Sequence, residues 1–189
     1  MNVVLTDLLS TQYTARLRIA PLEASHALVL HGPLQDPSIY TYIPEDPPLL
    51  DALKRRYAFL QNGQSPDGKE YWLNWVAFSR QSGEPVGTFQ ATLPEADEGT
   101  FAYVVLPTFW RQGYATEMAQ HMLTHLFDTA EIETIAAEID TRNSASIRLV
   151  ERLGLQRVST HTAADFFKGA QSDEHRYAVT RSAWVELHT

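Results

Sequence analysis

Residues 104–117 read VVLPTFWRQGYATE: an apolar run stops at a proline, a short loop follows, and a glycine opens a long helical pattern. The first turn of a helix leaves backbone N–H groups without partners and carries the positive end of the helix dipole, so such a junction can bind an anion. Gly113 lets an anion approach the backbone, the small Ala115 keeps the next approach point clear, and Arg111 adds positive charge. The segment therefore predicts a pyrophosphate site.

Other phosphate-binding patterns do not match this segment. It lacks the Lys-Ser/Thr ending of a P-loop, which argues against a nucleoside triphosphate, and it lacks the Gly-x-Gly-x-x-Gly pattern of dinucleotide-binding folds. Taken alone, Gly113 has a simpler interpretation, in which it only eases a tight turn before a helix.

The bulk properties set limits on the class of protein. A chain of 189 residues with 44% hydrophobic residues is long enough for one well-filled domain. The net charge of −8 argues against nonspecific binding of nucleic acid, which needs a basic face. The absence of Cys excludes thiol nucleophiles, disulfides and thiolate metal sites. No apolar run reaches membrane-spanning length, so no membrane partner is expected and the cytoplasm is the default location.

Hydrophobic periodicity predicts a mixture of helices and strands in one domain, residues 14–189, behind a loose N-terminal arm, residues 1–13. The expected strands are residues 15–20, 71–79, 85–93, 100–106, 134–140, 156–167 and 176–181. The expected helices are residues 22–30, 49–61, 113–130 and 143–153. Four prolines constrain residues 36–48 to a loop. This order favours an α/β arrangement on one central sheet.

Two blocks of sequence resemble the GNAT (Gcn5-related N-acetyltransferase) superfamily. Phe109–Glu117 resembles its acetyl-CoA pyrophosphate loop, in the branch that includes the ribosomal-protein alanine N-acetyltransferases, with Arg111 where that branch often has a first Gly. Asp140–Leu155 is similar to the family's Asn-x-x-Ser helix and the Lys/Arg-Leu-Gly-Phe that follows it. Asn143 lies 143 − 113 = 30 residues after Gly113, which leaves room for one helix and one strand.

The resemblance implies an acyl-CoA N-acyltransferase fold of the α/β (α+β) class, with one mixed, mostly antiparallel, splayed central sheet flanked by helices. It implies an enzyme that transfers the acetyl group of acetyl-CoA directly to a primary amine, on a small molecule or a protein N-terminus. The active unit is expected to be a monomer or a homodimer without a metal. A noncatalytic acyl-CoA-binding module and an interaction domain on the same fold are the alternatives.

The resemblance also implies which residues contact acetyl-CoA. The pantetheine arm is expected in the gap between the strands that end at Leu106 and Asp140. It would bond there to the backbone of Val104, Val105 and Leu106. Asn143, a good N-cap, and Ser146, one turn further on, are expected to face the pantetheine and the thioester sulfur. The pyrophosphate loop is expected to contribute Arg111, Gln112, Gly113, Tyr114, Ala115 and Thr116.

Aminolysis of a thioester needs a neutral amine and a proton for the leaving thiolate. The family branch often places a Glu where this sequence has Thr100, so the usual direct carboxylate base is missing here. Glu98, two residues earlier and on the same strand face, is the candidate base through water, and a solvated turn residue is its alternative. Ser146 is the candidate general acid.

Other residues carry weaker signals. His121 and His125 have helical spacing that can chelate zinc, but no third ligand accompanies them, so an exposed pair is favoured. Tyr42 lies in the proline-constrained loop that should flank the acceptor site, and Asp173, His175 and Tyr177 resemble a region that often borders it. At least one of Trp72 and Trp75 is expected in the core.

Overall fold

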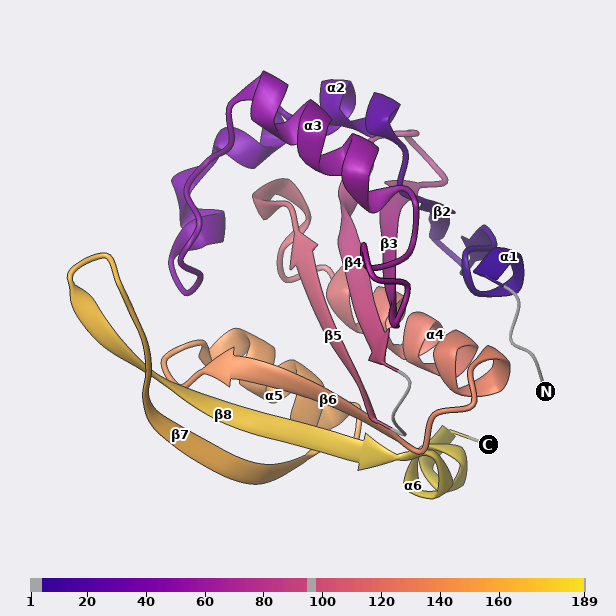
Figure 1. The fold of residues 1–189 in the computed structure, drawn as a ribbon, viewed down its shortest axis with the longest axis vertical. Helices are drawn as coiled ribbons and strands as arrows, with labels where there is room; N and C mark the ends of the chain where they lie inside the picture. The colour runs from indigo at the N-terminus through magenta and orange to yellow at the C-terminus, as the bar shows by residue number, and fades with distance from the viewer. Residues whose placement is uncertain (1–4, 95–97, 189) are drawn as a thin grey trace.

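The computed structural model describes residues 5–94 and 98–188. One sheet of eight strands, in the order β1-β2-β3-β4-β5-β6-β8-β7, runs through the whole molecule (Figure 1). Every neighbouring pair is antiparallel except β5 and β6, which are parallel. The strands are β1 (Gln12–Tyr13), β2 (Leu17–Pro21), β3 (Glu70–Ser79), β4 (Pro85–Pro94), β5 (Glu98–Val105), β6 (Thr134–Asp140), β7 (Gln156–Phe167) and β8 (Ala170–Thr180).

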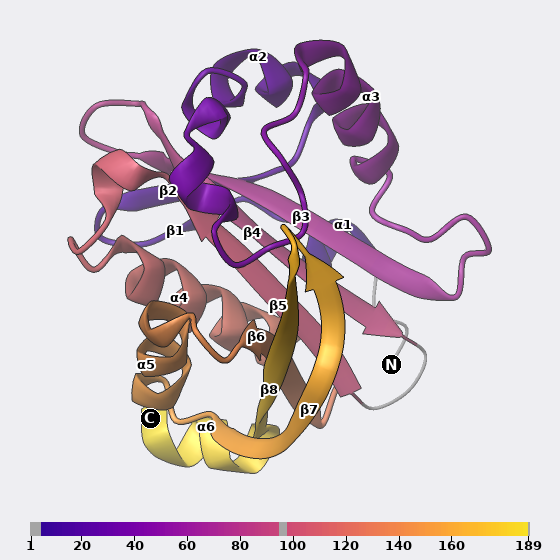
Figure 2. The same ribbon diagram turned by 90° about the vertical axis from the view of Figure 1, so that its left-hand side faces the viewer.

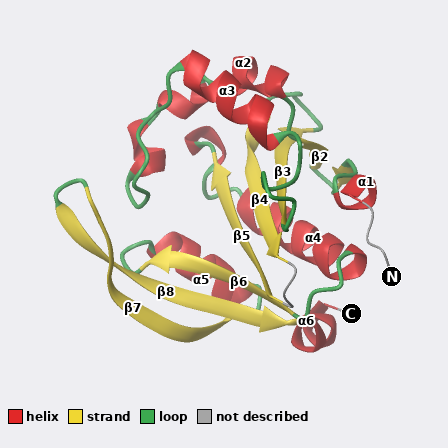
Figure 3. Ribbon diagram, viewed as in Figure 1, coloured by secondary structure: helices red, strands yellow, loops and turns green. Residues whose placement is uncertain are grey.

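Helices cover both faces of this sheet (Figures 2 and 3). They are α1 (Leu5–Leu8), α2 (Ala27–Leu30), α3 (Leu50–Leu60), α4 (Tyr114–Thr129), α5 (Ser144–Arg152) and α6 (Arg181–His188). The central strands are hydrophobic on both faces, because the larger core lies under α4 and the smaller one under α2 and α3. In β3, Trp75 and Ala77 join the first core, while Val76 and Phe78 join the second. Within the described residues, no helix is long and apolar enough to cross a membrane.

The sheet splays between β5 and β6. Their parallel pairing is limited to Glu98–Thr100 of β5 against Thr134–Ala136 of β6. Beyond this short contact, β5 remains paired with β4 and β6 remains paired with β8, so the two strands diverge. The mixed, mostly antiparallel, splayed sheet that the sequence predicts is confirmed.

Several predicted elements need correction. The N-terminal arm is not loose over its described part, because Leu8 of α1 is fully buried against α4. Residues 22–30 do not form one helix but a 3-10 turn, Ala24–His26, followed by the single turn α2. The last strand begins earlier than predicted, at Ala170, and Arg181 starts a helix that the periodicity did not indicate. Residues 1–4 of the predicted arm lie outside the described residues.

Asp140 fastens the junction between β6 and α5. Its carboxylate, 2% exposed, accepts hydrogen bonds from the backbone and guanidinium of Arg142 and, at 2.7 Å, from Ser172 Oγ on β8. The hydrogen bond from the Arg142 side chain is the largest influence on the pKa of Asp140 and lowers it. Burial raises this pKa and the hydrogen bond from Ser172 lowers it further, so the net value is about 2. The carboxylate therefore joins two strands to the start of α5, the helix that carries Asn143 and Ser146 at its N-terminus.

We predict that Asp140→Asn lowers the free energy of unfolding by about 2 kcal/mol at pH 7, since each unit of pKa shift corresponds to ~1.4 kcal/mol. The folded pKa lies below the ordinary value of about 3.9. This contribution is therefore complete above about pH 5 and is lost as the pH falls from about 4 to 2. Urea unfolding should show the same difference between variant and parent at pH 7 and 5, and a smaller one at pH 3. A difference that stays constant contradicts the assignment; Asp51→Asn, at an exposed carboxylate, is the control.

Candidate functional site

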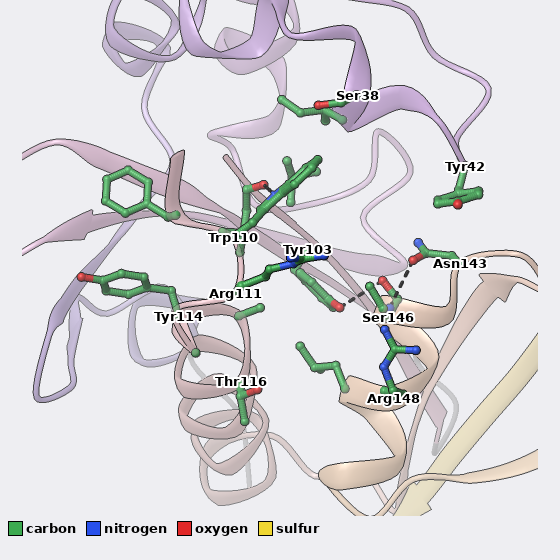
Figure 4. A pocket seen from close by; sticks show the side chains of 18 of the residues that line it. Ser38, Tyr42, Tyr103, Trp110, Arg111, Tyr114, Thr116, Asn143, Ser146 and Arg148 are labelled. Atoms are coloured by element: carbon green, nitrogen blue, oxygen red, sulfur yellow. Dashed lines mark hydrogen bonds between the residues drawn. The ribbon is translucent and has the colours of Figure 1, made fainter. Parts of the chain in front are cut away.

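A cavity of about 630 Å³ lies where β5 and β6 diverge. The loop after β5, the start of α4, helix α5 and the segment Ser38–Ile43 form its walls (Figure 4). All of the residues predicted to contact acetyl-CoA line this cavity except Leu106 and Gln112. The structure thus brings together two sequence blocks that are 30 residues apart.

The loop between β5 and α4 presents backbone amides to the cavity. Arg111 and Gly113 both have positive φ, 60° and 80°, which turn the chain sharply into the helix. Gly113 is the N-cap and has no side chain to cap the first turn, so the N–H groups of Tyr114, Ala115 and Thr116 lack intrahelical partners. The cavity wall here is therefore a set of open hydrogen-bond donors at the positive end of a helix of 16 residues.

The charge of the cavity is opposite to that of the whole chain. Arg111, Arg148 and Arg152 line it, and the lining residues include no Asp or Glu. None of these three arginines forms a salt bridge within the described parts of the chain. A protein with a net charge of −8 has thus concentrated unpaired cations around open amides, which suits a ligand with several phosphate charges.

The exposed edge of β5 offers fewer backbone groups than the sequence predicts. The N–H of Leu106 donates to Val86 at 2.9 Å and its carbonyl accepts from Phe109, so Leu106 is fully engaged within the protein. The backbone N–H and C=O groups of alternate strand residues point toward the same neighbouring strand. Those of Val104, like those of Leu106, therefore point toward β4, whereas those of Tyr103 and Val105 point into the gap. The indole of Trp110 donates to the Val105 carbonyl at 2.6 Å. The backbone groups of Val104 and Leu106 are therefore already bonded within the protein, so the predicted backbone contacts of these two residues with a ligand have no free groups to use.

Asn143 and Ser146 lie on the opposite wall. The side chain of Asn143 caps α5 by accepting a hydrogen bond from the Ser146 amide at 3.2 Å. Tyr103 of β5 donates from its hydroxyl to Ser146 Oγ across the cavity, at 3.1 Å (Figure 4). Burial raises the pKa of Tyr103, and its hydrogen bond to Ser146 only partly opposes this, so the phenol keeps its proton at neutral pH. Sequence reasoning missed Tyr103, because nothing local shows which residue it contacts.

A model of the family described as "Acetyltransferase (GNAT) domain" matches residues 16–156, about three quarters of the chain. The chain belongs to the GNAT acetyltransferase family. By this membership it is an acetyl-CoA-dependent N-acetyltransferase.

Individual relatives agree with this family. The chain is 29% identical over 195 residues to the FsC-acetyl coenzyme A-N(2)-transacetylase of Aspergillus fumigatus, covering 94% of this chain and 79% of that protein. It is 30% identical over 152 residues to the uncharacterized protein YkkB of Bacillus subtilis, covering 78% and 86% of the two chains.

Solved structures show the same fold at lower identity. Spermidine N-acetyltransferase from Vibrio cholerae, in complex with CoA and spermine, superimposes with a TM-score of 0.76 at 19% identity, covering 91% of this chain and 99% of that one. The ribosomal L7/L12 alpha-N-protein acetyltransferase RimL, in complex with coenzyme A, gives a TM-score of 0.77 at 16% identity, covering 90% and 97%. These neighbours establish the acyltransferase fold.

Glu98, the predicted base, lies away from this site. It is the first residue of β5, at the closed end of the splay, about 20 Å along the strand from Val104 at ~3.3 Å per residue. Its carboxylate is paired with the Arg176 guanidinium, which also bonds Glu138 at 2.8 Å. Glu98 lines neither cavity described here. Glu98 therefore lies outside both cavities, and we do not propose it as the base.

A second cavity, of about 260 Å³, adjoins the first on the α3 side of the sheet. The two share Ile43, Tyr103 and Val104. Its floor holds Asn74, Thr88 and Gln90 on adjacent strands, and its wall holds the carboxylates of Glu45 and Asp46. Arg56 lies 4.0 Å from Glu45 and compensates part of this charge. The second cavity is thus acidic where the first is basic.

The remaining candidates have structural contacts. His121 Nε2 lies 3.3 Å from Gln12 Oε1, and His125 Nε2 lies 2.9 Å from the Leu8 carbonyl, so both fasten the N-terminal segment to α4. Trp75 is fully buried in the larger core. Tyr42, expected beside the acceptor site, lines the first cavity and not the second. The residues Asp173, His175 and Tyr177 line neither cavity.

An ionic clamp that the sequence did not reveal holds the loop between β5 and α4. Arg16, just before β2, donates from Nη1 to the Gln112 carbonyl at 2.8 Å and from Nε to Glu117 Oε2 at 2.5 Å, with its guanidinium 4.2 Å from the Tyr114 ring centroid. Burial raises the pKa of Glu117, but the hydrogen bonds from Thr14 and Arg16 outweigh it, so the net pKa is lowered. The ionised Glu117 thus ties the first turn of α4 to the edge of the sheet.

We predict that Glu117→Gln weakens acetyl-CoA binding about 5- to 10-fold. The reason is that the loop must then be ordered at the expense of binding energy. Calorimetric titration with acetyl-CoA measures the affinity, and urea unfolding confirms the fold. Asp51→Asn, which removes an exposed carboxylate from α3, is the control and should bind as the parent does. Equal affinity in Glu117→Gln and the parent would show that the clamp is irrelevant to the cofactor.

Proposed function

We propose that this protein acetylates the primary amine of a small molecule, with acetyl-CoA in the basic cavity and the amine entering through the acidic one. The observation that carries the proposal is the set of open amides at the start of α4, surrounded by three arginines and no carboxylate. Pyrophosphate is a ligand that matches both the donors and the charge. The residues present therefore fit acetyl-CoA, which supplies the thioester to be cleaved.

The pantetheine arm is assigned to the splay between β5 and β6. Val105 and Tyr103 direct backbone groups into this gap, where an extended ligand can add to the strand edge. Because Trp110 already occupies the Val105 carbonyl, the ligand must either use the Val105 N–H alone or displace the indole. The amide nitrogen of Asn143 makes no hydrogen bond within the described part of the chain and is placed to meet a pantetheine carbonyl.

The reaction needs the lone pair of a neutral amine to attack the thioester carbonyl, after which the C–S bond breaks and the sulfur leaves as a thiolate. In this proposal Ser146 Oγ gives its proton to that thiolate and takes one from Tyr103, which donates to the same oxygen and regains a proton from water. We assign the proton of the amine to water, because neither cavity is lined by a His and the carboxylates of Glu45 and Asp46 are exposed to solvent. The attack takes place where the cavities meet, at Ile43, Tyr103 and Val104.

The acidic cavity sets the class of acceptor. Glu45 and Asp46 attract an ammonium, whereas the phenols of Tyr40 and Tyr57 stay protonated, because burial raises the pKa of both, that of Tyr57 to about 12. A volume of about 260 Å³ is below the ~300–1,000 Å³ typical of pockets for drug-sized ligands. A small amine fits these dimensions better than several residues of a peptide.

We predict that Thr116→Glu lowers acetyl-CoA affinity at least tenfold relative to Thr116→Gln. Thr116 lines the cavity in the first turn of α4, where a carboxylate stabilises the helix through its dipole but repels a phosphate. The two variants differ in charge and hardly in size, and calorimetric titration with acetyl-CoA compares them. Position 113 is less informative, because a side chain there points toward Arg16, 3.4 Å away. Equal affinities would refute the pyrophosphate assignment.

We predict that Ser146→Ala lowers kcat about 10²-fold with acetyl-CoA affinity nearly unchanged, since a leaving-group proton is needed only in the transition state. Tyr103→Phe keeps the serine and should lose less, about tenfold. Release of free thiol from acetyl-CoA, with spermidine and other small primary amines, measures turnover. Ser82→Ala, at an exposed serine in the turn between β3 and β4 that lines neither cavity, is the control. If kcat of Ser146→Ala falls by less than about threefold, Ser146 is not the general acid. If the parent protein binds acetyl-CoA but acetylates none of the amines, a noncatalytic module is favoured.

A further inference from the structure

The tip of the β7–β8 hairpin reaches the loop that separates the two cavities. The hairpin arches away from the sheet, and its end lies beside the segment after the 3-10 turn Pro37–Tyr40 (Figures 1 and 2). The contact is made by Lys168, whose ammonium donates to the carbonyls of Tyr40, Ile43 and Glu45. These partners are more than 120 residues away in the sequence.

A lysine is an unusual residue at this point of the chain. Phe167 and Ala170 are paired across a two-residue turn whose central residues, Lys168 and Gly169, have φ of 52° and 77°. Turns with positive φ at both central positions favour Asn-Gly or Asp-Gly, because a longer side chain is disfavoured there. The local backbone therefore does not account for Lys168, whereas the three carbonyls match the three N–H donors of its ammonium.

The hairpin is also bent toward the loop. Its register shifts between His161 and Asp165, and Ala163 there has a φ of 51° with its amide held by Asp173 Oδ1 at 2.8 Å. Bulges of this kind bend the strand that carries them. The bend and the lysine act together, because the first brings the tip within reach of the loop and the second holds it there.

The loop that Lys168 holds forms the acceptor side of the site. Tyr42 and Ile43 line the basic cavity, and Ile43, Glu45 and Asp46 line the acidic one. Four prolines restrict this segment, but only short 3-10 turns give it regular structure between residues 31 and 49. Its position over the sheet therefore depends on contacts from elsewhere, of which the Lys168 ammonium provides three.

We propose that Lys168 is a positioning residue that latches this loop to the β7–β8 hairpin and thereby restricts the acceptor to small amines, excluding peptide N-termini. The proposal rests on the assignment of the acidic cavity to the acceptor. With the latch closed, the wall that carries Glu45 and Asp46 is fixed close to the shared boundary at Ile43. Release of the latch frees that wall, which weakens small-amine binding and opens the site to an extended chain.

The first test is amide hydrogen exchange of residues 40–46, which needs no substrate. Lys168→Met keeps most of the aliphatic stem but removes the charge and all three donors. The exchange in this segment should be at least tenfold faster than in the parent. Lys168→Arg, which keeps donors and charge, should lie nearer to the parent. Lys69→Met, at an exposed lysine 3.9 Å from Asp67, is the control and should leave the segment unchanged. Unchanged exchange in Lys168→Met overturns the latch.

The second test compares kcat/KM for spermidine with kcat/KM for a tetrapeptide that has a free N-terminus. In Lys168→Met the ratio should fall at least fivefold, and Lys168→Arg should restore part of it. Faster exchange with an unchanged ratio overturns the selectivity role. If the parent acetylates neither probe although it binds acetyl-CoA, the proposed small-amine function fails, and the exchange rates alone decide whether the latch exists.

Discussion

The short parallel contact between β5 and β6 is the constraint on which the rest of the site depends. Three residues of each strand pair, and then β4 and β8 hold the two strands on diverging paths. The divergence leaves the edge of β5 without a neighbouring strand at Tyr103 and Val105, and it opens the space between α4 and α5. The open amides at the start of α4 and the serine at the start of α5 face each other across that space because each helix follows one of the diverging strands.

The separation of charge between the two cavities follows from the same geometry. The first cavity takes its arginines from the loop after β5 and from α5, while the second takes its carboxylates from the loop before α3. Opposite charges therefore lie on opposite sides of the shared boundary, formed by Ile43, Tyr103 and Val104. Under the proposed function, an anionic donor and a cationic acceptor are each attracted to their own side, which orients both before any bond is made.

Local features of the site were predictable from the sequence, and long-range ones were not. A proline that ends a strand, a glycine that opens a helix and an Asn-x-x-Ser at a helix start each depend on a few neighbouring residues, so the β5–α4 loop and the cap of α5 could be read directly. The clamp of Arg16 on Glu117 and the latch of Lys168 join positions about 100 or more residues apart. Neither has a sequence pattern, because only the folded sheet brings the partners together.

The position of Glu98 outside the cavity has a related reason. The alternation of strand residues correctly placed Glu98 on the same face as Thr100, but it did not show that the strands are still paired there and only diverge further along. Position along a strand matters as much as face when the sheet splays, because only the residues beyond the last pair reach the gap. Tyr103 lies past Thr100, beyond the last pair, and its side chain is on the face of β5 opposite to that of Glu98 and Thr100, where its hydroxyl contacts Ser146. For the proposed reaction, the groups that give or take protons are therefore best sought among the residues beyond the point of divergence.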